Sequence, residues 1–119
     1  MKLWIALVVV AACGGVDTDI ESDITISQGA YGLALDSNDN LGVGVGITVE
    51  DPPLPGQAHG ASLDAATTDA NGIYQFELPA GSYQLCTESC TLIEIPDEAR
   101  VRHDWINGAN GGSWCDGSC

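Results

Sequence analysis

From Gly29 onward, the chain consists of short segments in which apolar residues alternate with small or polar ones, and clusters of Gly, Pro, Asn and Asp separate these segments. Alternation with a period of two places every second side chain on the same face of an extended chain, so each segment predicts a half-buried β-strand. Seven short strands at this spacing are typical of a β-sandwich, so the sequence predicts an all-β fold. The expected strands fall within residues 31–35, 43–49, 62–68, 73–78, 82–87, 91–95 and 101–105.

The composition agrees with one small β domain and excludes several classes of partner. The chain has 119 residues, which allows one hydrophobic core, and 45% of them are hydrophobic but only 6% aromatic, which favours strands and turns. The 17 Asp and Glu residues outnumber the 3 Lys and Arg residues, for a net charge of −14. Such a surface repels phosphate backbones and anionic lipid headgroups. We therefore expect a soluble monomer that has no nucleic-acid partner.

The first residues predict an export signal that ends in a lipidation site. Lys2 precedes an unbroken apolar run over residues 3–12, which fits a secretory signal and is shorter than the about 20 residues of a membrane span. Residues 10–13 (VAAC) resemble the bacterial lipobox, whose cysteine receives a diacylglycerol. We expect a signal peptide over residues 1–12 and acyl chains on Cys13 that anchor the chain to a membrane. The alternatives are an ordinary signal peptide with an incidental cysteine and a misassigned start codon.

Two segments outside the alternating region are predicted to lack regular structure. Residues 13–28 are rich in acidic side chains and hold no sizeable apolar cluster, which indicates a flexible tether. Gly14, directly after the cysteine, resembles the residue found there in outer-membrane lipoproteins, so the outer membrane is the favoured place in the cell envelope. Residues 107–119 (NGANGGSWCDGSC) are rich in Gly, and we expect an irregular tail.

Residues 68–83 (TDANGIYQFELPAGSY) resemble the signature of carboxypeptidase regulatory-like domains, a pattern of the form T-D-x-x-G-x-Y-x-F-x-L-P-x-G-x-Y. Related patterns occur in adhesin B-type repeats and in transthyretin-like domains. The resemblance implies a seven-stranded Greek-key β-sandwich of the prealbumin or immunoglobulin kind over residues 29–106. It also implies a domain without a catalytic centre of its own, so we expect that the chain is not an enzyme. The signature residues expected in the core are Tyr74, Phe76, Leu78 and Tyr83.

The five cysteines divide into one expected lipid attachment site and two pairs with the same spacing. Cys86 and Cys90 flank a three-residue turn, and in a hairpin they lie opposite each other on the outer face, within reach of a disulfide. Cys115 and Cys119 pair most simply with each other. The alternative is a four-cysteine zinc site, which the four-residue separations and an oxidising exported setting both disfavour.

A calcium site is the second metal hypothesis that the sequence allows. The segment 36–42 (DSNDNLG) departs from an EF-hand loop because its glycine falls one position late. A looser calcium site could use Asp36, Asp39 and Asp69, but a plain polar loop is the favoured interpretation. No cofactor is therefore expected besides the lipid, and Ca²⁺ is not favoured.

Histidine and tryptophan residues give weaker functional signals. His59 lies in a loop rich in Pro and Gly and is expected to be exposed, whereas His103 is expected to be half-buried. No G-x-S-x-G motif accompanies them, which argues against a serine hydrolase. Trp105 is expected in the core. Trp114, in the Gly-rich tail, is expected to be exposed and could stack on a sugar ring.

The leading hypothesis is a non-enzymatic, lipid-anchored, exported β-sandwich that acts as an interaction or structural module at the cell envelope. Its expected partners are the membrane, through the lipid on Cys13, and an envelope protein or glycan. The alternative is a carbohydrate-binding lipoprotein that uses Trp114.

Overall fold

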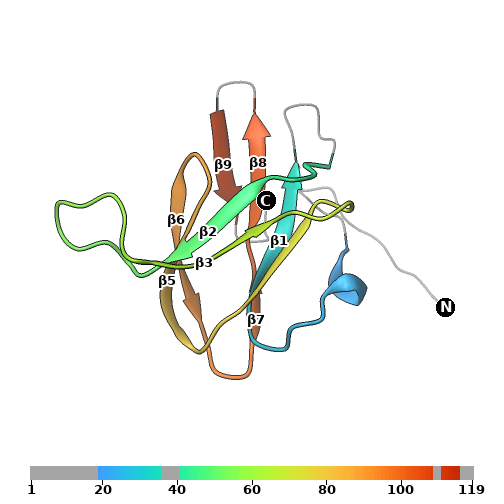
Figure 1. The fold of residues 1–119 in the computed structure, drawn as a ribbon. Helices are drawn as coiled ribbons and strands as arrows, with labels where there is room; N and C mark the ends of the chain where they lie inside the picture. Colours follow the sequence, from blue (N-terminus) through green and yellow to red (C-terminus); the bar gives the residue numbers. More distant parts are fainter. Residues whose placement is uncertain (1–18, 36–40, 109–110, 116–119) are drawn as a thin grey trace.

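The computed structural model describes residues 19–35, 41–108 and 111–115, and nearly all of its regular structure is β-strand (Figure 1). No helix within these residues is long and apolar enough to cross a membrane. A single 3₁₀ turn, η2, covers Glu21–Asp23 in the described part of the chain. The strands are β1 (Gly29–Leu35), β2 (Gly46–Glu50), β3 (Ser62–Thr67), β4 (Ile73–Glu77), β5 (Gly81–Cys86), β6 (Cys90–Ile95), β7 (Arg100–Arg102), β8 (Asp104–Gly108) and β9 (Gly111–Cys115).

These strands form two sheets, the two layers seen in Figure 1. One sheet has the order β4-β1-β8-β9, with β7 also paired to β1, and the other has the order β3-β2-β5-β6. The central strand β1 pairs antiparallel with β4 and parallel with both β7 and β8. The all-β sandwich is confirmed, but the described residues contain nine strands and not seven. One expected strand is split at His103 into β7 and β8, and β9 was not expected.

The main core lies between the two sheets. The alternation predicted it well, since the signature residues Tyr74, Phe76, Leu78 and Tyr83 are all buried there. The phenol of Tyr83 donates a hydrogen bond to the carbonyl oxygen of Pro79 at 2.7 Å, so the proline turn of the signature is tied to the core. The other members of this cluster are Ala30, Ile47, Val49, Leu85, Ile93 and Ile95.

A second apolar cluster covers the outer face of β1 and β4. Ile20 and Ile24 are buried there against Tyr31, Leu33 and Ile73. The prediction of a flexible tether is therefore wrong for residues 19–28, because the outer face of β1 is itself apolar and the isoleucines of the preceding segment cover it. Residues 13–18 lie outside the described residues.

The prediction of an irregular tail is also wrong for residues 107–108 and 111–115, which belong to β8 and β9. Strand β9 pairs antiparallel with β8, and Trp114 lies opposite Trp105. Gly112 permits this close packing, since a Cβ there would lie 2.0 Å from Cζ2 of Trp105. Glycines on both sides of Trp114 hide the alternation that marks the other strands.

Trp114 is half-buried, and the prediction that it is exposed is wrong. Its ring lies 5.3 Å from that of Trp105 and 6.2 Å from that of Tyr74, measured between centroids. Its indole Nε1 donates a hydrogen bond to the carbonyl oxygen of Ser89 at 2.9 Å, which joins the two sheets. Trp114 therefore packs at the edge of the core.

Candidate functional site

The outer face of the β3-β2-β5-β6 sheet carries a cluster of polar side chains that are buried although they point away from the core. Register places Glu50 of β2 opposite Gln84 of β5, and Gln84 opposite Leu92 of β6. Their neighbours Val49 and Leu85 face the core, so alternation directs Glu50 and Gln84 outward. Even so, Glu50 is only 8% exposed and Gln84 only 5%.

The β2–β3 loop, residues 51–61, accounts for this burial. Gln84 donates from Nε2 to the carbonyl oxygen of Ala58 at 3.1 Å and to Oε1 of Glu50 at 3.3 Å. The loop is closed at its base, where the amide of Asp51 donates to the carbonyl oxygen of Ala61 at 2.9 Å. Figure 1 shows the loop projecting at the left of the molecule. Two buried polar side chains thus fix the returning half of this loop on the sheet.

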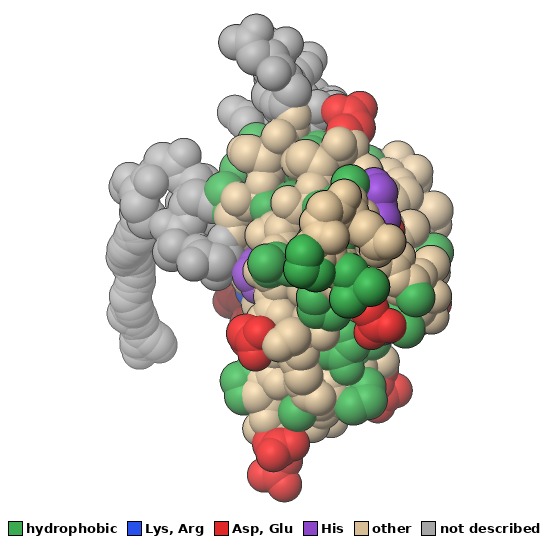
Figure 2. Space-filling view, turned by 90° about the vertical axis from the view of Figure 1, so that its left-hand side faces the viewer, with side chains coloured by type: hydrophobic (Ala, Val, Ile, Leu, Met, Phe, Trp, Pro, Cys, Tyr) green, Lys and Arg blue, Asp and Glu red, His purple; other side chains and the backbone are tan. Residues whose placement is uncertain are grey.

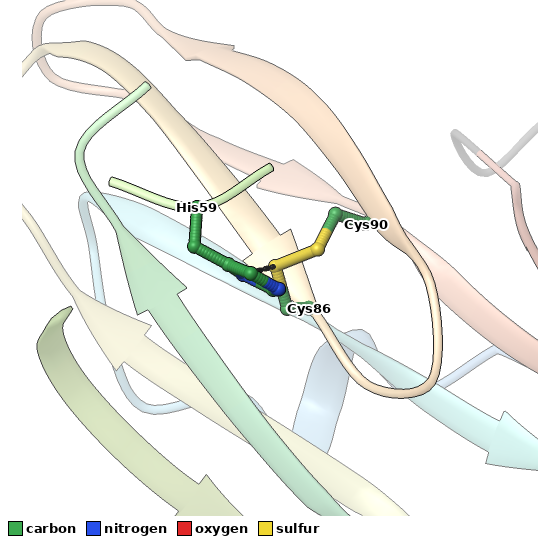
Figure 3. A group of neighbouring side chains, drawn as sticks. All are labelled: His59, Cys86 and Cys90. Atoms are coloured by element: carbon green, nitrogen blue, oxygen red, sulfur yellow. Dashed lines mark hydrogen bonds between the residues drawn. A yellow bond between two sulfur atoms is a disulfide. The ribbon is translucent and has the colours of Figure 1, made fainter. Parts of the chain in front are cut away.

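His59 is held between the buried carboxylate and a disulfide. Its Nδ1 lies 3.1 Å from each carboxylate oxygen of Glu50 and 3.9 Å from Sγ of Cys86. The side chain is 60% exposed, so the ring is oriented by the protein and still reaches solvent. Figure 3 shows the imidazole pointing from its loop toward the bonded sulfurs of Cys86 and Cys90. An oriented, accessible imidazole of this kind can bind a metal or transfer a proton.

The predicted Cys86–Cys90 disulfide is confirmed. The two residues lie opposite each other at the turn end of the β5–β6 hairpin, as the strand pattern predicts. Cys86 is buried and Cys90 half-buried. Cys115 is also disulfide-bonded, and Cys119, its expected partner, lies outside the described residues.

His59, Cys86 and Cys90 form a group whose nitrogen and sulfur atoms all lie within 4.8 Å of one another. The sequence predicts an exposed His59 in a loop, and pairs of cysteines or a four-cysteine zinc site, but nothing in it joins His59 to Cys86 and Cys90. No spacing in the sequence links a histidine to cysteines 27 and 31 residues away. The signal lies in the strand register, which puts the base of the β2–β3 loop next to the end of β5.

The other candidate residues are less informative. Oδ1 of Asp69 accepts hydrogen bonds from the amides of Asn71 at 2.8 Å and Ile73 at 3.0 Å, so its carboxylate shapes the turn before β4. Asp36 and Asp39 lie outside the described residues, and so does Cys13. Calcium binding and lipidation therefore remain predictions.

A second charged cluster holds the N-terminal segment against the sheet. Arg100 donates from Nη1 to the carbonyl oxygens of Ile24 at 3.2 Å and Ile26 at 2.9 Å. Its Nη2 pairs with Oε1 of Glu21 at 2.8 Å, and its guanidinium lies 5.5 Å from the ring centroid of Tyr31. The phenol of Tyr31 donates to the other carboxylate oxygen of Glu21. This cluster is a clamp that ties the segment before β1 to β7.

The clamp shifts the pKa values of both acidic members. Burial, together with the hydrogen bond to Glu21, raises the pKa of Tyr31 to about 12. The same hydrogen bond lowers the pKa of Glu21, and Arg100 adds to this effect against the opposing cost of burial.

The alkaline stability of the chain should report on this clamp. Because the pKa of Tyr31 is higher in the folded chain than its ordinary value of 10.0, folding favours the protonated phenol. Its stabilising contribution is complete below pH 10 and is lost as the pH rises toward about 12. Urea midpoints measured between pH 8 and pH 11 should fall less steeply for Tyr31→Phe than for the natural chain. Equal slopes for the two proteins would contradict the clamp.

The structure is similar to that of a 5-hydroxyisourate hydrolase from Klebsiella pneumoniae, with a TM-score of 0.56 at 20% sequence identity. The match covers 77% of this chain and 99% of that chain. The likeness supports the β-sandwich fold. No family model matches the chain, and no curated protein matches it.

This comparison overturns the prediction that the chain is not an enzyme. That prediction depended on the fold having no catalytic centre, and the similar chain is a hydrolase. At 20% identity the likeness concerns the fold alone. A β-sandwich of this kind can therefore be an enzyme, so the fold does not argue against catalytic activity.

Proposed function

We propose that the chain is an exported lipoprotein, anchored through Cys13 at the cell envelope, whose β-sandwich binds an envelope protein through the β2–β3 loop. The observation that carries the binding role is the fixation of this loop by Glu50 and Gln84, which are buried on the outer face of the sheet. Burying a carboxylate and an amide costs free energy unless both are hydrogen-bonded. Here both groups are hydrogen-bonded, and they hold an exposed loop in one position on a rigid scaffold, which is how binding loops are commonly presented.

The loop itself has the properties of a contact surface. Leu54 is 66% exposed and lies between Pro53 and Pro55. The two prolines restrict the backbone in the unbound chain, which reduces the entropy that binding would cost. Leu63 on β3 and Leu92 on β6 are exposed as well. Figure 2 views the molecule from the side on which the loop projects, and hydrophobic side chains gather near the centre of that face. Apolar contacts of this kind favour a protein partner over a glycan.

Lipidation is tested by labelling. Cells that express the natural chain with a labelled fatty acid should incorporate the label, and the chain should fractionate with membranes. Cys13→Ala should lose both the label and the membrane fraction, because two or more acyl chains are needed for stable anchoring. Label that persists in the Cys13→Ala chain would contradict the lipoprotein assignment.

Binding through the loop is tested by photo-crosslinking in cells. A photoreactive amino acid in place of Leu54 should give a discrete adduct in the envelope fraction. The matched control is the same amino acid in place of Asp97, which is also exposed but lies in the turn between β6 and β7. Identical patterns from the two positions would show that the loop has no specific partner.

A further inference from the structure

We propose that His59, Cys86 and Cys90 form a zinc site that is closed while the cysteines are disulfide-bonded and opens when they are reduced. The three residues come from the β2–β3 loop and from both strands of the β5–β6 hairpin, and their ligand atoms lie within 4.8 Å of one another.

The ligand set suits zinc. Thiolate sulfur and imidazole nitrogen are the commonest zinc ligands in proteins, and a carboxylate oxygen can complete the tetrahedron. Reduced Cys86 and Cys90 and His59 thus offer three ligands of the types that zinc prefers. The carboxylate of Glu50, whose oxygens lie 3.1 Å from Nδ1 of His59, lies beside this group.

The distances in the oxidised chain are already near those of a zinc site. With Zn–S bonds of about 2.3 Å and Zn–N bonds of about 2.0 Å, neighbouring ligand atoms of a tetrahedral ion lie roughly 3.3–3.8 Å apart. The distance from Nδ1 of His59 to Sγ of Cys86 is 3.9 Å, and the distances to the Glu50 oxygens are 3.1 Å. The two sulfurs, which are bonded to each other, must separate. Both lie at the end of a hairpin, where the turn residues Glu88 and Ser89 are exposed.

The switch requires a reductant, and a dithiol of the kind carried by envelope oxidoreductases supplies it. A thiolate of that dithiol attacks the sulfur of Cys90, which is the more accessible of the two, and Cys86 leaves as a thiolate beside His59. The second thiol of the donor then releases Cys90, and the donor becomes a disulfide. Two electrons and two protons pass to the pair. Zinc binding to the two thiols then releases both of these protons to solvent.

Zinc titration of the full-length chain in detergent tests the proposal. The oxidised chain and the chain reduced with a phosphine are each titrated with Zn²⁺ against a chromogenic chelator. Reduction should create a tight site, and His59→Ala should weaken it by about 100-fold or more, because loss of a ligand costs at least as much as loss of a residue that orients one. Equal zinc binding before and after reduction would overturn the proposal.

The chain contains its own control. Cys115 and Cys119 have the same spacing as Cys86 and Cys90, so the double variant Cys115→Ser, Cys119→Ser retains one pair and removes the other. It should keep the tight zinc site, whereas Cys86→Ser, Cys90→Ser should lose it. The opposite result would assign zinc to the other pair and overturn the proposal.

A measurement on the natural chain removes any dependence on the folding of variants. Zinc added to the reduced chain should slow alkylation of Cys86 and Cys90, as followed by peptide mass spectrometry, and should leave the rate at Cys115 unchanged. Alkylation of Cys86 and Cys90 at an unchanged rate would refute the site.

Discussion

Gly32→Ala is expected to lower the free energy of unfolding by roughly 3 kcal/mol or more, which is enough to unfold a large part of the population of a small domain. Gly32 lies in the central strand β1, paired with Tyr74 of β4 on one side. A Cβ at this position would lie 1.9 Å from the carbonyl oxygen of His103 and 2.9 Å from Cε2 of Tyr74. The carbonyl belongs to the backbone between β7 and β8, both of which pair with β1, so it has little freedom to retreat. Urea unfolding followed by tryptophan fluorescence measures the loss.

Gly46→Ala is the matched control for this substitution. Gly46 also lies in a strand, β2, but a Cβ there would meet no atom within 4 Å. The Gly46→Ala substitution should change the free energy of unfolding by no more than about 0.5 kcal/mol, as for most surface substitutions. If the two variants proved equally stable, the close approach of β1 to His103 would be wrong.

Glycines also limit how much of the fold can be predicted from the sequence. Alternation located the strands that face the main core, because residues such as Tyr74, Phe76 and Leu85 are large and separated by polar ones. It failed where small residues interrupt it. The close packing of β9 depends on Gly112, and a glycine gives no signal of burial in a hydrophobicity pattern.

Prediction of the segment before β1 failed for a different reason. Ile20 and Ile24 are separated by a segment that contains charged residues, so the segment gives no apolar pattern. Their burial depends on the apolar outer face of β1, and the sequence does not show that this face needs a cover. The candidate site was predictable only in part. The hairpin disulfide followed from local spacing, whereas the approach of His59 depends on the register between β2 and β5.

Arg102→Met is expected to destabilise the chain by about 3–5 kcal/mol, because it removes one partner of a buried ion pair. Nε of Arg102 lies 3.0 Å and 3.1 Å from the carboxylate oxygens of Asp104, whose side chain is 1% exposed. The amide of Leu33 also donates to Oδ1 of Asp104, at 2.9 Å. Without the guanidinium, the buried carboxylate would lose its charged partner and keep the hydrogen bond from the amide of Leu33. The free energy of unfolding from urea titration at neutral pH gives the size of the effect.

The double variant Arg102→Met, Asp104→Asn separates the burial of an unpaired charge from the loss of packing. Asparagine is neutral and nearly isosteric with aspartate, and its carbonyl oxygen can still accept the hydrogen bond from Leu33. The double variant should therefore regain most of the stability that Arg102→Met loses, since a neutral side chain costs far less to bury than a charge. A double variant that is no more stable than Arg102→Met would mean that Arg102 contributes through the packing and hydrogen bonds of its guanidinium and not by neutralising Asp104. Arg102 belongs to β7 and Asp104 to β8, and both strands pair with β1. Such a result would therefore also mean that the ion pair between these two side chains is not needed to hold β7 and β8 beside β1.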